Sequence, residues 1–221
     1  LALAARAFPL IGLGVGAAAA GGLWLASGLG LHPIGCALIG LALAAALTGA
    51  LHEDGLADVA DGFGGGSDCN AKLKIMRDSR IGAFGVLALI FSVGIRTTVL
   101  GGLMGAGLAE ATLVCAAVVS RAVLPMMMAR MPMARSDGLA ATAGTPNDET
   151  AWTALVLGTV GSIVLLGLMS GLIAVASACV TTVAVAWLSR RQIRGYTGDV
   201  LGAVQQAVET AVIVAAGATA L

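Results

Sequence analysis

Residues 51–80, LHEDGLADVADGFGGGSDCNAKLKIMRDSR, form the stretch around which the rest of this chain must be arranged. They include six of the twelve acidic residues of the chain and four of its twelve basic residues. These are Glu53, Asp54, Asp58, Asp61, Asp68, Asp78, Lys72, Lys74, Arg77 and Arg80. A charged side chain at the centre of a bilayer costs about 3 kcal/mol. We therefore expect this stretch to lie in water, at an interface or around counter-ions, and we interpret it as the candidate active site.

The composition of the chain is that of a membrane protein. Of its 221 residues, 58% are hydrophobic and 11% are charged, and the mean hydropathy is +0.97. The net charge is zero and the basic residues form no continuous run, which argues against a nucleic-acid partner. The four cysteines form no CxxC pair, so neither a zinc site nor a disulfide framework is indicated.

Long uncharged runs predict an all-α, polytopic transmembrane helix bundle. The first run has 22 residues, about 33 Å as a helix, which matches the thickness of a bilayer core. The run at residues 151–188 has 38 residues and must fold back, most simply at the GLMSG sequence of residues 167–171. About seven spans result: residues 10–31, 34–51, 81–100, 108–129, two within 151–188, and 200–221.

The order of the spans places three polar segments on one side of the membrane, because two spans separate each segment from the next. The segments are residues 51–80, 130–150 and 189–199. Eleven of the twelve basic residues fall on that side if Arg121 is included, and we expect Arg96 to reach the opposite interface. The positive-inside rule then predicts that the segments face the cytoplasm from the inner membrane.

The start of the chain does not resemble a secretion signal. The chain begins at Leu1 rather than at a methionine, and its first apolar run is too long for the core of a signal peptide. We therefore expect that the N-terminus is truncated.

Three aspartates in the first polar segment are spaced as metal ligands on one helix face. Asp54, Asp58 and Asp61 lie at positions i, i+4 and i+7, so they share a face if this segment continues the preceding span as a helix. Like charges on one face repel, and carboxylates without His or Cys partners suit Mg²⁺. The alternative is a solvated helix end.

Basic residues follow the aspartates within a few helical turns. Lys72, Lys74, Arg77 and Arg80 could neutralise phosphate oxygens beside a metal held by carboxylates. Phosphoryl transfer depends mainly on such positioning and charge neutralisation. Anchoring of the chain by positive charges on the cytoplasmic side is the alternative explanation for these residues.

Two long motifs resemble one known family. HEDGLADVADG at residues 52–62, followed by KLKIMRDSRIGAFG at residues 72–85, resembles the signature of the cobalamin synthase family, the adenosylcobinamide-GDP ribazoletransferases. AFPLIGLGVG, SRAVLPMMMARMPMARSDGL and GYTGDVLGAVQQAVE are similar to segments of that family in the same order. Glu53 departs from the pattern, which has an apolar residue there. The resemblance implies one integral membrane transferase domain over residues 1–221.

The resemblance implies a magnesium-dependent reaction in cobalamin nucleotide-loop assembly. A ribose hydroxyl of α-ribazole, or of its 5′-phosphate, would attack the cobinamide-bearing phosphate of adenosylcobinamide-GDP and release GMP. Asp54, Asp58 and Asp61 would hold the metal, and Arg77 and Arg80 would bind phosphate oxygens. Asp78 would be a further ligand or would orient the two arginines.

The other polar residues are candidates for substrate binding. Asp199 is the strongest of them because its TGD setting suggests a shaped turn. Glu209 lies within the last span, where an intramembrane carboxylate is either functional or hydrogen-bonded to Gln205 or Gln206. The candidate substrate-binding residues are His52, Lys72, Arg135, Asp137, Arg194, Thr197 and Asp199.

Two rival functions remain open at this stage. A transporter would use Glu209, Arg96 and Glu110 as part of an ion path, but transporters place polar groups at mid-span in related halves. A CDP-alcohol-type phosphotransferase would share the chemistry, but the DGxxAR opening of that family is absent. The expected partners are the two substrates and a lipid bilayer, and a homo-oligomer is possible.

Overall fold

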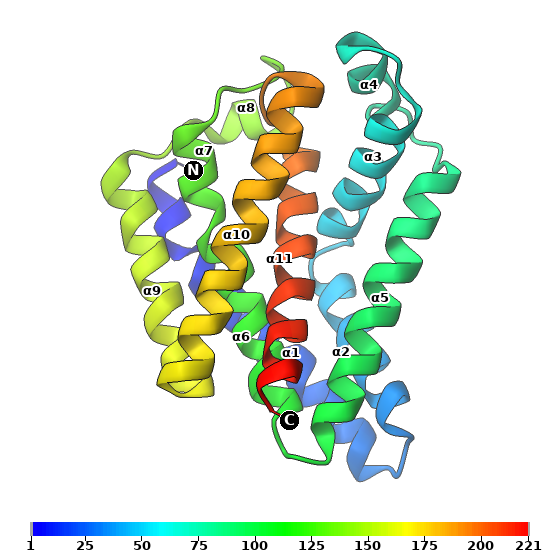
Figure 1. Cartoon of the computed structure of the whole chain (residues 1–221), viewed down its shortest axis with the longest axis vertical. Coiled ribbons are helices and arrows are strands. Elements are labelled where there is room, and N and C mark those ends of the chain that lie inside the picture. The colour runs from blue at the N-terminus through cyan, green and yellow to red at the C-terminus, as the bar shows by residue number, and fades with distance from the viewer. Residues whose placement is uncertain (1, 221) are drawn as a thin grey trace.

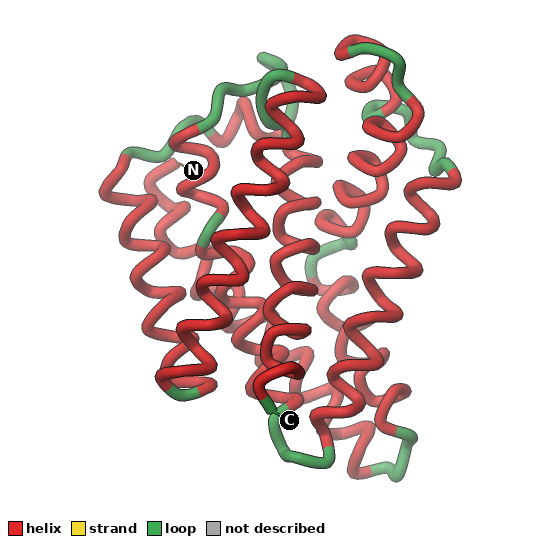
Figure 2. Tube along the Cα trace, in the orientation of Figure 1, coloured by secondary structure: helices red, strands yellow, loops and turns green. Residues whose placement is uncertain are grey.

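The computed structural model describes residues 2–220, without the side chains of residues 139 and 141, as a bundle of helices (Figures 1 and 2). Within these residues there is no β-strand, and an isolated bridge joins Met133 to Tyr196. The helices are η1 (Ala2–Ala7), α1 (Phe8–Gly28), α2 (Pro33–Leu47), α3 (Leu51–Gly65), α4 (Cys69–Ile75), α5 (Ala83–Met104), α6 (Ala109–Ala122), α7 (Leu124–Arg130), α8 (Leu139–Ala143), α9 (Asp148–Leu166), α10 (Leu168–Ile193) and α11 (Gly198–Thr219).

Six helical stretches of the described chain are long and apolar enough to cross a membrane. They are η1 with α1, then α5, α6 with α7, α9, α10 and α11. The pair α2 and α3 passes the same test together but is bent by 92° at its break. The predicted all-α membrane bundle is confirmed, with six candidate spans, or seven if the bent pair forms one span.

The break between α2 and α3 corrects the expectation that the acidic stretch continues the preceding span as one helix. Gly49 and Ala50 adopt the left-handed conformation, with φ of 60° and 55°. Neither residue can continue a right-handed helix in that conformation. Ala50 is also sterically strained there by its Cβ atom, which glycine lacks. The hydroxyl of Thr48 donates to the carbonyl oxygens of Ala44 and Ala45, at the end of α2. Figure 1 shows α2 and α3 in opposite halves of the bundle.

The centre of the bundle is α6, whose residues 112–122 are all buried. Helix α1 packs closely on it through the GxxxG pair Gly12 and Gly16. A Cβ atom added at Gly12 would lie 2.3 Å from the carbonyl oxygen of Ala117, so the two backbones approach as small residues allow. Phe8, in the first turn of the same helix, lines a cavity described below.

The outward faces of the long helices carry large apolar side chains. Trp24 on α1 and Phe91 on α5 are 64% and 62% exposed, and Val164 on α9 and Val180 on α10 are 78% and 70% exposed. Side chains of this kind on the outside of a bundle are expected to contact lipid. The protein is therefore a multi-pass membrane protein.

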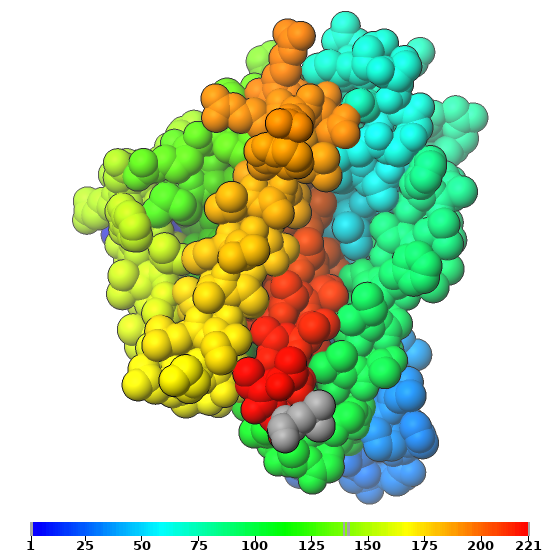
Figure 3. Space-filling model, in the orientation of Figure 1, coloured from blue at the N-terminus to red at the C-terminus, as the bar shows by residue number. Residues whose placement is uncertain are grey.

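The three polar segments meet at one end of the bundle. Arg77 of the first segment pairs with Asp137 of the second at 2.6 Å, and Arg135 of the second pairs with Asp199 at 3.2 Å. Lys72 of the first segment donates to Gln192 at the end of α10. In Figure 3 the α3–α4 region, in cyan, and the end of α10, in orange, adjoin at the top of the molecule. The predicted grouping of the segments is confirmed, and their cytoplasmic side stays a prediction.

This grouping predicts the outcome of a labelling experiment in sealed vesicles. With the other cysteines replaced by alanine, Cys69 and a cysteine introduced by Thr145→Cys should react with a membrane-impermeant maleimide from the same side. Ala106→Cys, in the loop between α5 and α6, should react from the opposite side, because α5 separates it from Cys69. Labelling of positions 69 and 145 from opposite sides would refute the arrangement.

Candidate active site

Two cavities meet at Asp54 on α3. The first has a volume of about 410 Å³ and is lined mainly by apolar residues of α1, α7 and α8 together with polar residues of α3 and α11. The second has a volume of about 260 Å³ and is lined by Asp54, Asp58 and the loop of residues 76–81. Within the described chain, Asp54 is the residue common to both. We call them the apolar cavity and the polar cavity.

Small residues hold the start of α3 against the start of α11. A Cβ atom added at Gly55 would lie 2.6 Å from the carbonyl oxygen of Asp199, and one added at Gly202 would lie 3.2 Å from the Cα of His52. The two glycines let the first turns of both helices touch. His52, Asp54 and Asp199 consequently line the same apolar cavity.

The three aspartates of α3 do not all have the same role. Asp54 and Asp58 line the polar cavity. The carboxylate of Asp61 instead accepts hydrogen bonds from the backbone N–H groups of Gly82 and Gly85, at 2.6 and 2.9 Å, and so caps the start of α5. Its assignment as a metal ligand stays a prediction.

The polar cavity has two carboxylates in its lining, those of Asp54 and Asp58, whose oxygens are of the kind that Mg²⁺ takes as ligands. In the part of the chain that the structure describes, no group of three or more His, Cys, Asp or Glu side chains is arranged to hold a metal. The carboxylates of Asp54, Asp199 and Asp61 nevertheless lie close enough to repel that of Asp58, and Arg135 is the nearby cation. Mg²⁺ commonly takes one or two carboxylates and completes its shell with water and substrate phosphates. Asp54 and Asp58 supply such a pair.

The loop between α4 and α5 presents arginines to the polar cavity. Arg80 pairs with Asp78 at 2.6 Å, and Arg77 and Arg80 both line the cavity. The hydrogen bond from the Arg80 side chain lowers the pKa of Asp78 from the usual 3.8 to about 2. Asp78 is therefore anionic at neutral pH and orients Arg80. Of its two expected roles, the contacts match the orienting one.

The second and third polar segments close the apolar cavity. Arg135 and Asp199 both line it, and they pair with each other. Thr197 accepts a hydrogen bond from the Val200 N–H as the N-cap of α11 and donates to Asp199 at 3.0 Å. The expectation of a shaped turn around Asp199 is confirmed by this cap.

Some predicted residues lie away from the two cavities. Lys72 is engaged with Gln192, and Asp137 pairs with Arg77 on the surface. Arg194 is exposed and ends α10 with a φ of 65°. These three are predicted substrate-binding residues that line neither cavity. The apolar lining was not predicted, because Phe8, Leu124 and their neighbours look like ordinary span residues.

A buried ion-pair network lies below the site. Arg96 pairs with Glu209 at 2.8 Å and Arg121 approaches the same carboxylate at 3.9 Å. The side chains of Arg96, Arg121 and Glu209 are only 3%, 7% and 6% exposed. The expectation that Arg96 reaches an interface is therefore wrong, and Arg121 cannot be counted with the charges of the polar end. The carboxylate of Glu209 is a buried counter-charge that favours an interior position for both Arg96 and Arg121.

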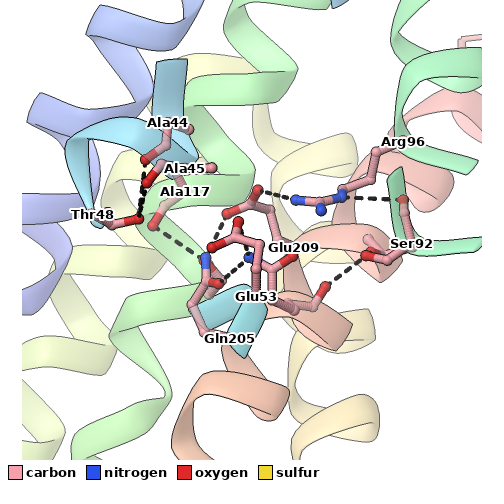
Figure 4. Close-up of polar contacts among 12 residues, drawn as sticks. Ala44, Ala45, Thr48, Glu53, Ser92, Arg96, Ala117, Gln205 and Glu209 are labelled. Atoms are coloured by element: carbon pink, nitrogen blue, oxygen red, sulfur yellow. Dashed lines mark hydrogen bonds and ion pairs between the residues drawn. The ribbon is translucent and has the colours of Figure 1, made fainter. Parts of the chain in front are cut away.

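The network extends to the first turn of α3. Gln205 donates to Glu209 and, at 3.1 Å, to Ser120, and Gln206 donates to Glu53 at 3.0 Å (Figure 4). This confirms the expected hydrogen bond between Glu209 and Gln205. Glu53 directly precedes Asp54, the residue common to both cavities. The network therefore holds the first turn of α3, and Asp54 with it, in place.

A family model described as cobalamin-5-phosphate synthase matches residues 1–217. The chain belongs to this family. The match covers nearly the whole chain, so it confirms the resemblance that the two long motifs predict. No solved structure matches the chain.

Three members of the family illustrate how similar the relatives are. Each is named adenosylcobinamide-GDP ribazoletransferase. The protein from Bradyrhizobium diazoefficiens is 44% identical over 99% of this chain and 84% of its own length. The corresponding values are 45%, 98% and 83% for Mesorhizobium japonicum, and 42%, 94% and 81% for Azorhizobium caulinodans.

The buried network predicts a large loss of stability when its carboxylate is removed. Glu209→Leu should lower the free energy of unfolding by about 3–5 kcal/mol, because two buried arginines lose their counter-charge. Thermal unfolding of the purified protein in detergent measures this. Glu110→Leu, the same change in the first turn of α6, should lower the melting temperature much less. Equal melting of Glu209→Leu and the unmodified protein would contradict the role of the network.

Proposed function

We propose that the chain is an adenosylcobinamide-GDP ribazoletransferase. In this reaction the ribose hydroxyl of α-ribazole, or of its 5′-phosphate, bonds to the cobinamide-bearing phosphorus. The bond between that phosphorus and the bridging oxygen breaks, and GMP leaves. The family match and the names of the relatives support this activity.

One observation in the structure carries the proposal. Asp54 is shared by an apolar cavity and a polar cavity with two arginines. A transferase of this kind must bring a nucleoside hydroxyl to a diphosphate, and these two groups need different surroundings. Asp54, at the junction of the two cavities, would help to orient the hydroxyl toward the diphosphate.

The polar cavity is proposed to bind the diphosphate. Arg77 and Arg80 would neutralise its non-bridging oxygens, and Asp78 would keep Arg80 extended toward them. Asp54 and Asp58 would hold Mg²⁺, which when bound supplies positive charge to the phosphate oxygens. The role proposed for Asp61 in this scheme is to fix α3 to α5.

We also propose that the site faces the cytoplasm. The support is the concentration of basic residues in the three polar segments. Arg121 is not counted among them, because it is buried beside Glu209. The leaving group GMP and a nucleotide-activated substrate would then be exchanged directly with the cytoplasm.

The reaction itself tests the proposal. Purified protein in proteoliposomes, incubated with adenosylcobinamide-GDP, α-ribazole and Mg²⁺, should release GMP and form a corrinoid with the mass of adenosylcobalamin. Addition of EDTA should abolish GMP release, and excess Mg²⁺ should restore it. Mass spectrometry measures both products, and no corrinoid product with either α-ribazole or its 5′-phosphate would refute the proposal.

Variants of α3 provide the controls for this experiment. Asp54→Ala and Asp58→Ala should each reduce GMP release at least a hundredfold while the protein stays in the membrane fraction. Asp148→Ala, which removes an exposed carboxylate at the start of α9, should change the rate less than twofold. Full turnover in both α3 variants would remove their assignment as metal ligands.

A further inference from the structure

One part of the lining of the apolar cavity is apolar and another part is polar. The side chains of Phe8, Leu124 and Met128, with Ala140 and Ala143, line it from α1, α7 and α8. The polar lining comes instead from α3, from the segment before α8 and from the start of α11. A ligand that fills this cavity must therefore combine an apolar part with a polar part.

We propose, on the basis of the proposed function, that this cavity binds the acceptor nucleoside. Its flat apolar heterocycle lies against Phe8, Leu124 and Met128, and its ribose lies toward Asp54. The cobinamide-GDP substrate then binds from the polar cavity, with its corrinoid outside the apolar one. The two substrates occupy separate cavities that meet at the reacting atoms.

The volume of the cavity supports a nucleoside. Pockets of roughly 300–1,000 Å³ enclose small organic ligands, and this one measures about 410 Å³. A benzimidazole riboside fits within such a space. A corrinoid with its axial adenosyl group is several times larger and does not fit.

The apolar part of the lining favours the heterocycle of the acceptor over guanine. The edge of guanine carries N–H donors and a carbonyl acceptor that need partners when buried. Phe8, Leu124 and Met128 offer none. A benzimidazole with methyl substituents has no such donors on its outer edge, so its burial against these side chains is favourable.

The polar part of the cavity has an unsatisfied donor. The Nη1 atom of Arg135 is buried and has no hydrogen-bond partner within the described residues, although Nη2 of the same side chain bonds Asp199. A buried unpaired N–H group is costly, and an acceptor oxygen of the ligand would satisfy it. The ribose hydroxyls of α-ribazole and the phosphate of its 5′-phosphate both provide such an oxygen.

Two substitutions on α8 test this assignment. Ala143→Phe fills the apolar cavity, whereas Thr142→Phe changes the neighbouring exposed residue on the same helix. Calorimetry on the purified full chain should give at least tenfold weaker binding of α-ribazole to the Ala143→Phe variant and unchanged binding to the Thr142→Phe variant. The same titrations with α-ribazole 5′-phosphate show whether the phosphate adds affinity. The KM for adenosylcobinamide-GDP should change less than twofold in both variants.

Two results would overturn the assignment. One is unchanged α-ribazole affinity in the Ala143→Phe variant, and the other is a selective loss of GMP or adenosylcobinamide-GDP binding. Failure of the proposed function gives a different result, because the unmodified protein would then bind neither substrate and form no product.

A second measurement applies if Ala143→Phe does not fold. In a chain whose native cysteines are replaced by alanine, alkylation of a cysteine introduced by Ala140→Cys should be slowed by α-ribazole and unaffected by GMP. Protection by GMP alone would assign the cavity to the guanosine of the other substrate.

Discussion

The structure depends on one carboxylate, that of Glu209, which lies between Arg96 and Arg121 inside the bundle. Buried charges are tolerated in a membrane protein when they are paired and hydrogen-bonded, and removal of one partner is far more costly than absence of the pair. Four helices meet here. The ion pairs join α5, which carries Arg96, and α6, which carries Arg121, to Glu209 on α11. The hydrogen bond from Gln206 of α11 to Glu53 adds α3. The pairing matters most for α3, which a 92° break separates from α2. Without a continuous helix to hold it, the first turn of α3 is fixed by these contacts and by the glycine contacts with α11.

The position of that turn explains how a largely apolar chain can hold a charged site. α3 carries its aspartates toward the end of the bundle where the three polar segments meet, so the carboxylates and arginines have access to water and to each other. Arg77 with Asp137, and Arg135 with Asp199, join segments that are 60 and 64 residues apart in the chain. The Arg77–Asp137 pair is exposed and contributes little stability, whereas the side chains of Arg135 and Asp199 are only 17% and 20% exposed. Each pair includes a residue that lines one of the cavities, so both pairs help to fix the geometry of the site. Transporters also combine broken helices with buried charges, but here residues of the polar segments line both cavities, and the family match favours the enzyme.

Much of this arrangement could be predicted from the sequence. Uncharged runs of membrane length gave the spans, and i, i+4 spacing correctly placed Asp54 and Asp58 on one face. The break at residues 48–50 was not predicted, because these residues continue an uncharged run without a proline. Arg96 was misplaced because its partner Glu209 lies 113 residues away, and hydropathy alone favours an interface for a lone arginine. The role of Asp61 could not be predicted, because it caps α5 by accepting hydrogen bonds from the N–H groups of Gly82 and Gly85. These groups lie beside Asp61 only in the folded protein, where α5 begins next to α3. The apolar lining has no sequence signal that separates it from lipid-facing residues.

The central claim is that the diphosphate binds in the polar cavity beside Asp54, with the nucleoside on the other side of that residue. The most direct test is an electron cryomicroscopy structure of the protein with Mg²⁺, α-ribazole and an analogue of adenosylcobinamide-GDP whose diphosphate bridge is a methylene group. The account predicts that the diphosphate lies between Arg77, Arg80 and the carboxylates of Asp54 and Asp58. A diphosphate bound elsewhere, or carboxylates of Asp54 and Asp58 that point away from it, would contradict the account.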